Sequence, residues 1–262
     1  MAQTKMVFQR LEKKYIITQA QKKLFLEKAG THLKNDLFDA STICNIYFDT
    51  DQYALINRSI QKPPYKEKLR LRSYGIPNSD STVYLEIKKK YKGTVNKRRI
   101  SLTITQAQDL LQHHTLSKES TQIHRELAYF MKFYQPTPKI FIAYERNAWI
   151  GSEDKELRIT FDTQLRRRYD RLSFTEGDDG KPLLNHNQAL MEIKVANAYP
   201  LWLTHILSEL KLYPASFSKY GTAYMSDIVK AKQLTLSNEF TCREASAFGY
   251  QQKEAYSCLQ AY

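Results

Sequence analysis

The sequence contains little glycine and lacks the glycine-rich loops that hold phosphate groups through backbone amides. It has 8 glycines in 262 residues, and no GxxxxGKS, GxxxxGKT or GxGxxG motif occurs. Any bound anion must therefore be held by side chains. Histidine pairs with metal-ligand spacing are also missing, since there is no HxxxH or HExxH motif. His113 and His114 are adjacent, so they point apart on a helix, and we expect them at its surface.

Cysteine and long apolar runs are scarce too. The three cysteines, Cys44, Cys242 and Cys258, are widely spaced and form no CxxC pair. This pattern predicts free thiols in a reducing compartment, with Cys44 a core thiol. The first residues lack the apolar core of a signal peptide, and no stretch approaches the ~18 apolar residues of a membrane helix. We therefore expect a soluble, cytoplasmic chain.

Positive charge is abundant. There are 40 Lys and Arg residues against 27 Asp and Glu, a net charge of +13. This balance predicts a polyanionic partner, and nucleic acid, anionic lipid and phosphate all fit it. A hydrophobic fraction of 42% is ample for a folded core. We expect one domain over residues 1–232 and a mobile or peripherally packed tail over 233–262.

Alternating apolar and charged residues predict a series of β-strands. In KLRLRSYG, residues 68–75, a strand sends Arg70 and Arg72 to one face and the two leucines to the other. The same alternation predicts strands at residues 7–17, 82–90, 97–104, 139–149, 157–165 and 190–195. A more apolar strand at 43–50 is expected to be buried on both faces. A hairpin through Lys92 and Gly93 fits the spacing of two of these strands.

Segments between the strands predict helices, at residues 18–33, 105–115, 120–134 and 199–211. Residues 216–232 are expected to turn helical near their middle. Thr18 and Thr105 are the expected N-caps, and Pro200 falls in the first turn of its helix. Residues 175–183, TEGDDGKPL, have turn chemistry. They predict a solvated hairpin loop, with metal binding by its acids as the alternative.

The charged faces of the strands have an unusual composition. The positions in phase are eleven bases and four acids, namely Arg10, Lys14, Arg70, Arg72, Lys88, Lys90, Lys97, Arg99, Arg146, Arg158 and Lys194 against Glu12, Glu86, Asp162 and Glu192. Each strand taken alone might simply turn a polar face to water. An ordinary solvated sheet mixes the signs, however, because like charges on neighbouring strands repel. If the strands close into a barrel, the bases converge on one axis and predict a compact polyanionic ligand.

The four acids have two interpretations. Hard carboxylates bind Mg²⁺ or Mn²⁺, which in turn bridges phosphate oxygens. Alternatively, the acids form ion pairs with the neighbouring bases. For Glu86, which lies near several lysines, both interpretations stay open, whereas for Glu192 we favour a metal.

Nine short motifs, in order along the chain, are similar to those of a known family: RLEKKY, YFDT, KLRLRSYG, LEIKKK, NKRR, YER, LRITFDT, MEIKV and SFSKYG. With them, the chain resembles the triphosphate tunnel metalloenzymes, the CYTH-like superfamily, and within it the polyphosphate polymerase domain of the vacuolar transporter chaperone (VTC) proteins. The resemblance implies an α+β fold, with an eight-stranded antiparallel barrel, helices outside it and a basic tunnel.

The resemblance also implies roles for single residues. It assigns phosphate contacts to Lys14, Arg70, Arg72, Lys88, Lys97, Arg146, Ser218 and Lys219. Of these, Arg70, Arg72, Lys88, Arg146 and Lys219 are the predicted catalytic residues. Tyr144 would line the tunnel, and Glu192, with Glu12, would hold the metal. Phosphate binding by Lys90, Arg99, Arg158 and Lys194 is predicted from strand phase. Many hydrolytic members begin with ExExK, whereas this chain has Arg10, Glu12 and Lys14, which favours the polymerase branch.

The predicted activity is metal-dependent phosphoryl transfer. The γ-phosphate of ATP or another nucleoside triphosphate passes to a growing polyphosphate chain, with Mn²⁺ or Mg²⁺ as cofactor, and pyrophosphate is a further expected ligand. The alternatives are an inorganic or RNA triphosphatase and a non-catalytic polyphosphate-binding module. We expect no nucleic acid partner, because there is no RNP1-like run and no aromatic residues are placed beside the basic rows as stacking platforms for bases. A membrane partner would be a separate polypeptide, and the sequence leaves the oligomeric state open.

Overall fold

The structure is a computed structural model that describes residues 11–114, 116 and 121–231. The chain divides into two units, residues 1–221 and 222–262, and the sheet belongs to the first. Arg10, Cys242, Cys258 and the predicted tail at 233–262 lie outside the described residues. The domain boundary at residue 232 therefore stays a prediction.

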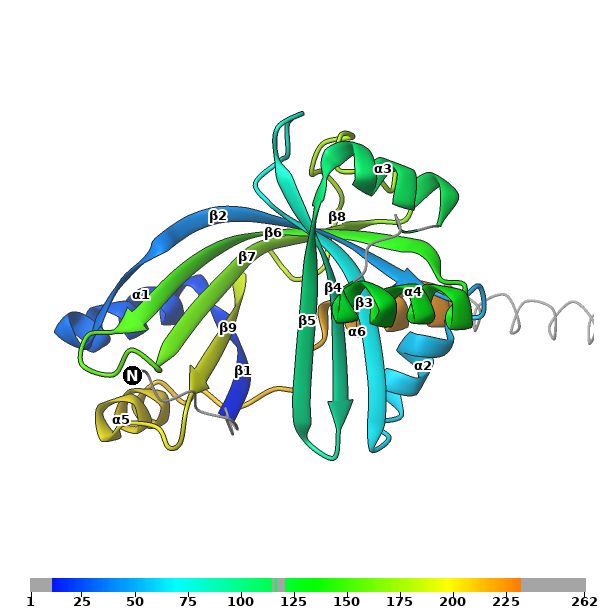
Figure 1. Cartoon of the computed structure of the whole chain (residues 1–262). Coiled ribbons are helices and arrows are strands. Elements are labelled where there is room, and N and C mark those ends of the chain that lie inside the picture. The colour runs from blue at the N-terminus through cyan, green and yellow to red at the C-terminus, as the bar shows by residue number, and fades with distance from the viewer. Residues whose placement is uncertain (1–10, 115, 117–120, 232–262) are drawn as a thin grey trace, which may run out of the picture. The chain divides into compact units, whose positions relative to one another are not determined.

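One antiparallel sheet organises the first unit (Figure 1). Its strands are β1 (Leu11–Thr18), β2 (Leu33–Asp49), β3 (Tyr65–Tyr74), β4 (Thr82–Tyr91), β5 (Thr94–Thr103), β6 (Thr137–Gly151), β7 (Arg158–Arg168), β8 (Lys181–Pro182) and β9 (Gln188–Val195). Their order across the sheet is β1-β9-β7-β6-β2-β3-β4-β5, with β8 attached to β7. Within the described residues β1 and β5 are not paired with each other, so the sheet arches without a closing ladder.

Helices pack against the sheet, and those on the outer face of the arch bury two hydrophobic cores there. Their bounds are α1 (Gln19–Ala29), α2 (Ala54–Ile60), α3 (Ile104–His113), α4 (Gln122–Tyr134), α5 (Leu201–Glu209) and α6 (Lys219–Ala223), with a short 3₁₀ turn at Gly30–His32. One core packs α3 and α4 against Leu69, Leu71 and Ile87, and the other packs α1 and α5 against Phe161 and Ile193. Because side chains alternate along a strand, the residues between these point to the inner face.

Side-chain caps explain where the helices begin. Thr18 caps α1 in a capping box with Gln21, as predicted. The cap of α3 is Thr103, paired with Gln106, so the predicted cap at Thr105 was wrong by two residues. Pro200 is the N-cap residue of α5 and not part of its first turn. Residues 216–232 are helical in the middle of the segment, as expected: α6 begins at Lys219, and a π-helix follows over Tyr224–Val229.

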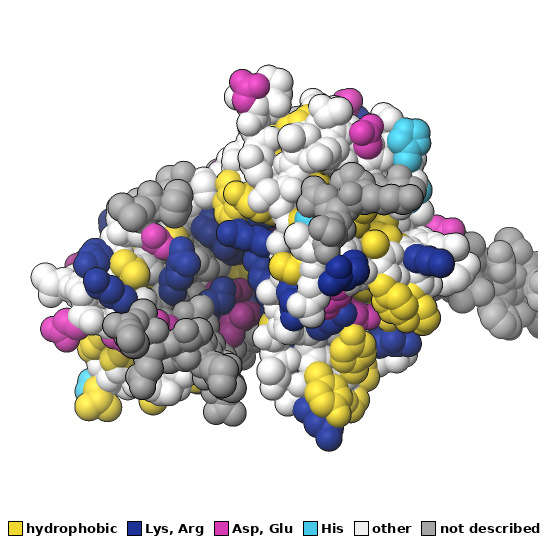
Figure 2. All heavy atoms as spheres, viewed as in Figure 1, with side chains coloured by type: hydrophobic (Ala, Val, Ile, Leu, Met, Phe, Trp, Pro, Cys, Tyr) yellow, Lys and Arg dark blue, Asp and Glu magenta, His cyan; other side chains and the backbone are white. Residues whose placement is uncertain are grey.

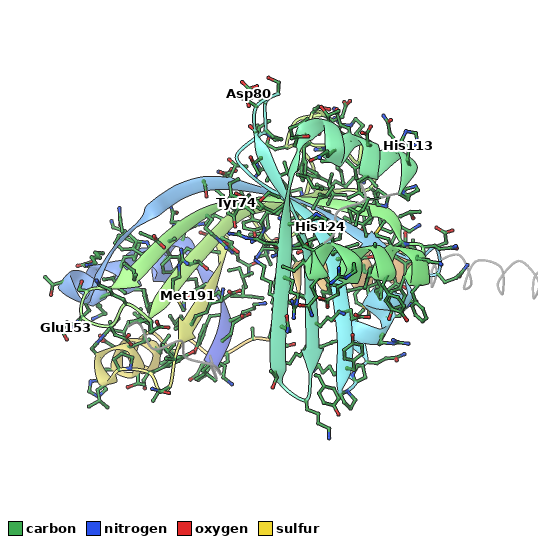
Figure 3. All side chains as sticks on the ribbon, viewed as in Figure 1. Tyr74, Asp80, His113, His124, Glu153 and Met191 are labelled. Atoms are coloured by element: carbon green, nitrogen blue, oxygen red, sulfur yellow. The ribbon has the colours of Figure 1, made fainter. Side chains whose placement is uncertain are left out.

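Several local predictions are confirmed. The β4–β5 hairpin turns through Lys92 and Gly93, with φ angles of 43° and 91° that suit the tight turn. Cys44 is buried, and burial raises the pKa of its thiol to about 12, so it is a protonated core thiol. Figure 3 shows His113 and His124 on α3 and α4, on the outer side of the sheet. No helix within the described ranges is long and apolar enough to span a membrane.

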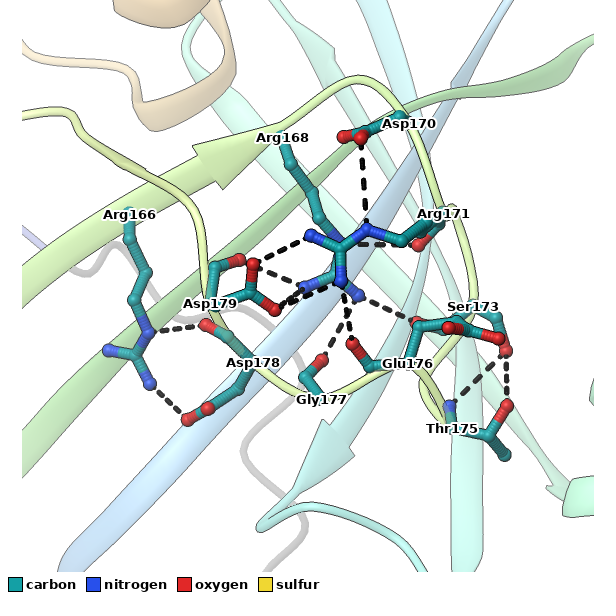
Figure 4. A network of polar contacts seen from close by, with 10 residues as sticks. All are labelled: Arg166, Arg168, Asp170, Arg171, Ser173, Thr175, Glu176, Gly177, Asp178 and Asp179. Carbon is teal, nitrogen blue, oxygen red and sulfur yellow. Dashed lines mark hydrogen bonds and ion pairs between the residues drawn. The ribbon is translucent and has the colours of Figure 1, made fainter.

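The loop between β7 and β8 is held by arginines (Figure 4). Arg168 is buried and donates to backbone carbonyls of Arg171, Ser173, Gly177 and Asp179, at 2.9–3.1 Å. Its guanidinium also lies 3.8 Å from the ring centroid of Phe141. Asp178 pairs with Arg166, and Asp179 pairs with Arg171. Both aspartates of this predicted loop are therefore engaged in ion pairs.

Candidate functional site

Basic side chains gather on the inner face of the arch. We call the following thirteen residues the inner cluster: Lys14, Lys68, Arg70, Arg72, Lys88, Lys97, Arg146, Lys194 and Lys219, with the acids Glu12, Glu86, Asp162 and Glu192. They come from seven strands and the start of α6. Figure 2 shows Lys and Arg side chains around the hollow between the β1–β9 and β3–β5 sides of the sheet.

Glu86 is the first of three carboxylates that tie the cluster together. Its Oε2 accepts from Arg70 Nε at 2.9 Å and Nη2 at 2.8 Å, and its Oε1 lies 2.6 Å from Lys97 Nζ. Arg72 Nε is 3.9 Å from the same carboxylate. Burial raises the pKa of Glu86, but Arg70, Arg72 and Lys97 outweigh burial and lower it to about 2. Glu86 is thus an ion-pair acid, which settles the question that its sequence position left open.

Asp162 plays the same part for cations of β6 and α6. It is fully buried and accepts two hydrogen bonds from Arg146, at 2.6 and 2.8 Å. Lys219 Nζ lies 2.6 Å from its Oδ2. Burial lowers the pKa of Lys219, but Asp162 and Tyr144 raise it above the ordinary value, so this amine is charged at neutral pH.

Glu192 is the third carboxylate. Lys194 forms an ion pair with its Oε1, and Lys14 Nζ is 3.7 Å from its Oε2. Lys14 also lies 3.5 Å from Glu12 and donates to the carbonyl of Phe217 at 3.3 Å. Burial raises the pKa of Glu192, yet the surrounding lysines lower it far below the ordinary range. The carboxylate is therefore ionised at any neutral pH.

Electrostatic coupling across the hollow shows that the strand faces converge. The pKa of Lys88 on β4 is lowered by burial first, and it also responds to Glu12 and Lys14 of β1 and to Glu192 of β9. β4 and β1 are far apart in the order of the sheet, with five strands between them. Only a strongly curved sheet brings them within reach of each other, so the inner cluster is one site.

Two tyrosines are embedded among these cations. Tyr144 is 1% exposed, and Arg72 donates to its hydroxyl at 3.3 Å. Burial raises the pKa of Tyr144, but Arg146, Arg72 and Lys219 lower it to about 8. Tyr47 accepts from Arg70 at 3.1 Å. Tyr144 lies among the basic residues, as the resemblance implied, and both tyrosine hydroxyls accept arginine hydrogen bonds that the carboxylates leave open.

Three further predicted residues lie on the same face with different partners. Arg99 packs over the ring of Tyr84, with its guanidinium carbon 4.6 Å from the centroid. Arg158 forms an ion pair with Asp36 of β2. Lys90 faces Lys66 across the β3–β4 ladder. Ser218 accepts from Lys68 Nζ at 3.0 Å, which connects the α6 segment to β3.

Sequence reasoning missed Lys68, Asn45 and Tyr47. Lys68 precedes Arg70 by two residues, so the alternation that selected the two arginines also selects it. Its amine is half-buried. Burial lowers its pKa most, Tyr47 raises it, and Lys14 and Lys88 lower it, so that the net pKa is about 8. Asn45 Oδ1 accepts from Arg72 Nε at 3.0 Å. Asn45 and Tyr47 lie on the strand expected to be buried on both faces, and although Tyr47 begins the YFDT motif, neither residue was given a role.

Glu12 and Glu192, the predicted metal ligands, offer hard oxygen donors on either side of Lys14. Thr160, opposite Glu192 in the β7–β9 ladder, adds a buried hydroxyl with no hydrogen-bond partner in the described part of the chain. Two carboxylates suit Mg²⁺ or Mn²⁺, which usually keep water and phosphate oxygens as remaining ligands. No group of three or more His, Cys, Asp or Glu with metal-binding geometry occurs among the described residues. Substrate oxygens would therefore have to complete the coordination.

The arched sheet and its basic inner face define an anion-binding protein of the triphosphate tunnel fold, as predicted. The VTC domain model matches residues 9–227, so the chain belongs to the VTC domain family. No curated protein matches it.

Solved structures are similar to this chain at low sequence identity, and the first of the following three supports the fold. A putative adenylate cyclase from Bacillus halodurans is 14% identical over 80% of this chain and 93% of its own, with a TM-score of 0.53. A putative adenylate cyclase from Vibrio parahaemolyticus is 10% identical; the match covers 82% of this chain and 97% of that protein, with a TM-score of 0.46. A putative adenylyl cyclase from Hippeastrum, described as having a dominant triphosphatase activity, is 16% identical. The match covers 80% of this chain and 93% of that protein, with a TM-score of 0.47.

Proposed function

We propose that this protein transfers the γ-phosphate of a nucleoside triphosphate, ATP among them, to the end of an inorganic polyphosphate chain held on the inner face of the sheet. The observation that carries the proposal is the surplus of positive charge, since nine basic residues of the inner cluster share four carboxylates. Such repulsion costs stability unless a polyanion neutralises it. Membership in the VTC domain family supports the choice of polyphosphate as that polyanion.

The reaction asks for cations more than for a protein nucleophile. The bond between the γ-phosphorus and the β–γ bridging oxygen breaks, and a terminal oxygen of the acceptor chain forms the new bond. The nucleoside diphosphate leaves with the bridging oxygen. Negative charge spreads over the transferred oxygens, and Arg70, Arg72 and Arg146 are placed to stabilise it. The acceptor phosphate is already anionic at neutral pH, so no strong base is required.

Carboxylate partners hold these arginines in place before substrate arrives. Arg70 is fixed by Glu86 and Arg146 by Asp162, and each guanidinium keeps further N–H groups free of those acids. Fixed donors lose little side-chain entropy when they bind phosphate. A divalent cation bound by Glu12 and Glu192 would supply additional charge neutralisation on phosphate oxygens.

Aromatic side chains at one end of the β3–β5 face support a nucleotide as the donor. Tyr84 lies opposite Arg72 in the β3–β4 ladder, and Tyr74 contacts it edge-on with a centroid distance of 5.8 Å. Tyr74, labelled in Figure 3, is half exposed. A nucleobase can stack on such rings while its phosphates reach Arg72 and Arg70.

Purified protein incubated with ATP and Mn²⁺ tests the proposal. We expect a long, acid-labile phosphate polymer together with ADP. Orthophosphate without polymer would make the protein a triphosphatase, and binding without any turnover would make it a polyphosphate-binding module. Arg70→Ala and Glu192→Ala serve as comparison variants, because unchanged rates in both would contradict the residue assignments.

A further inference from the structure

Four lysines extend the inner face beyond the arginines. In the β3–β4 ladder Lys68 lies opposite Lys88, and two residues further along Lys66 lies opposite Lys90. Residues two apart on a strand share a face, so both pairs continue the row of Arg72 and Arg70. They run toward the end of the sheet where the β4–β5 hairpin turns (Figure 1). We call these four residues the lysine pairs.

The lysine pairs differ from the arginines of the inner cluster, because none of the four lysines has a carboxylate partner in the described part of the chain. Lys68 donates to Ser218 Oγ at 3.0 Å, and Lys66 donates to the carbonyl of Ser59 at 3.4 Å. Within the described residues no ion pair to an acid is found for any of the four, whereas Arg70 has Glu86 and Arg146 has Asp162. Like charges directly opposite each other on neighbouring strands destabilise a sheet, and here this occurs in two successive pairs.

The outer face of the same strands shows that this is not a general property of the hairpin. Between the lysine pairs, Glu67 lies directly opposite Lys89, and their charges pair at 3.6 Å. Lys89 also pairs with Glu126 at 2.6 Å, and Arg98 pairs with the same acid at 3.1 Å. The outer face therefore balances its charges, and only the inner face leaves lysine against lysine.

The electrostatics agree with an unneutralised anion site. Burial lowers the pKa of Lys66, and the nearby Lys90 and Lys62 lower it further. The pKa of Lys88 is lowered by burial first and also by Lys14, whereas the carboxylates of Glu12 and Glu192 across the hollow raise it. A bound anion would relieve this repulsion and favour the charged amines.

Distance separates the lysine pairs from the triphosphate. Each step of two residues advances about 6.6 Å along a strand, so the Lys66–Lys90 pair lies about 13 Å beyond Arg70. Three phosphates gripped at Arg70 and Arg72 do not extend that far, whereas a linear polymer does.

We propose that the lysine pairs bind the polymer chain itself, several phosphates away from the reacting group, and thereby select long polyphosphate over short. This inference rests on the proposed function, because it assigns one part of the inner face to the polymer chain and another part to the nucleotide donor. Lys66 and Lys68 gain a role here that their sequence motif did not suggest. Lysines suit such a path because point charges on flexible stems hold a sliding chain without fixing its register.

The test compares phosphate chains of two lengths. The double variant Lys66→Gln/Lys90→Gln is titrated with inorganic polyphosphate of about one hundred units and with tripolyphosphate, at several salt concentrations. We expect the affinity for the long chain to fall at least tenfold, and the slope of log affinity against log salt to decrease by about two. The affinity for tripolyphosphate should fall no more than about threefold.

Lys13→Gln/Lys155→Gln is the matched control, because it removes the same charge from exposed positions outside the inner face. An equal loss in this variant, an equal loss for both chain lengths, or no loss for the long chain would overturn the proposal. So would failure of the wild-type protein to bind the long chain.

A polymer-length readout separates this inference from the proposed function. If the wild type makes polymer from ATP, the double variant should release shorter chains, and unchanged chain lengths would count against the lysine pairs. If the wild type makes no polymer but binds long chains through these residues, the proposed function fails while the binding site stands. Thermal unfolding checks folding, and we expect an unchanged or raised Tm because repulsion is removed.

Discussion

Arg146 and Asp162 face each other across the β6–β7 ladder and form a two-point ion pair, with Nε–Oδ1 and Nη2–Oδ2 distances of 2.6 and 2.8 Å. Lys219, more than fifty residues away in the sequence, donates to the same carboxylate. One buried negative charge thus holds two cations side by side. The trio keeps a net positive charge, so it can both fix the side chains and attract phosphate.

This arrangement predicts a large effect of Asp162→Asn on stability. Removing the carboxylate leaves Arg146 and Lys219 buried without a counter-charge, which typically costs about 3–5 kcal/mol. Urea unfolding at pH 7 measures the loss. Asp51→Asn is the control, because Asp51 pairs with Lys139 at an exposed position and its loss should change stability far less. Equal effects of the two substitutions would contradict the ion-pair role.

Glu86 predicts a dependence of stability on acid pH. Burial raises its pKa, but Arg70, Arg72 and Lys97 lower it to about 2 in the folded state, below the ordinary value of 4.5. A carboxyl with a lowered pKa contributes stability above pH 4.5, and this is lost as pH falls toward 2. The shift corresponds to a contribution on the order of 3 kcal/mol.

Glu86→Gln should therefore be less stable at pH 7 and should lose less stability between pH 4.5 and 2 than the wild type. Denaturant unfolding at a series of pH values gives both numbers. A variant with the same slope as the wild type over this range would show that other carboxyls carry the effect.

Period-two alternation was enough to predict most of the sheet and the basic face. KLRLRSYG places its leucines in the outer core and its arginines inside, and the structure has the same division. The prediction stopped short at Lys68, although the same phase includes it. Helix ends were harder, because Thr103 and Thr105 are both acceptable caps, and only the Gln106 side chain decides between them.

The partners of each charge were beyond the reach of the sequence. Glu86, Asp162 and Glu192 looked alike as isolated acids, and their roles depend on strands that come together only in the folded sheet. Lys219 lies in SFSKYG, where nothing in the local pattern indicates that it meets Asp162. The missing ladder between β1 and β5 is likewise a matter of strand curvature, which alternation does not encode.

Lys68 predicts that polyphosphate binding weakens as pH rises through about 8. Burial lowers its pKa most, Tyr47 raises it, and Lys14, Lys88 and Lys66 lower it, with a net pKa of about 8. Above this pH the amine loses its charge and with it the attraction for phosphate. Calorimetry at pH 7 and pH 9 should show several-fold weaker binding at the higher pH and proton uptake on binding near pH 8.

Lys68→Arg is the discriminating variant, because arginine stays charged at both pH values. Its affinity should change less between pH 7 and 9 than that of the wild type. If the two proteins show the same pH dependence, Tyr47, Lys88 or another group on this face titrates instead.

Glu192 predicts the position of the divalent cation. Mn²⁺ binding in the presence of tripolyphosphate, followed by calorimetry, should weaken at least tenfold in Glu192→Gln, since a carboxylate ligand is lost. Tripolyphosphate binding without metal should instead be unchanged or stronger, because Lys14 and Lys194 lose their acid partner. Glu153→Gln, at an exposed position on the outer side (Figure 3), is the control. Unaltered Mn²⁺ binding in Glu192→Gln would remove Glu192 as a ligand.

Tyr84 predicts how the site distinguishes a nucleotide from inorganic triphosphate. The guanidinium carbon of Arg99 lies 4.6 Å from the centroid of the Tyr84 ring, and the ring contacts Tyr74. Tyr84 is thus next to the arginines that would bind the phosphates. Tyr84→Ala should raise the KM for ATP about tenfold, the equivalent of a stacking contribution of 1–3 kcal/mol. The affinity for tripolyphosphate should change much less, because no base is present to stack. Tyr129→Ala, which removes an exposed aromatic ring from α4, should leave both values unaltered. Equal losses for ATP and tripolyphosphate in Tyr84→Ala would mean that the ring supports Arg72 and Arg99 and does not contact a base.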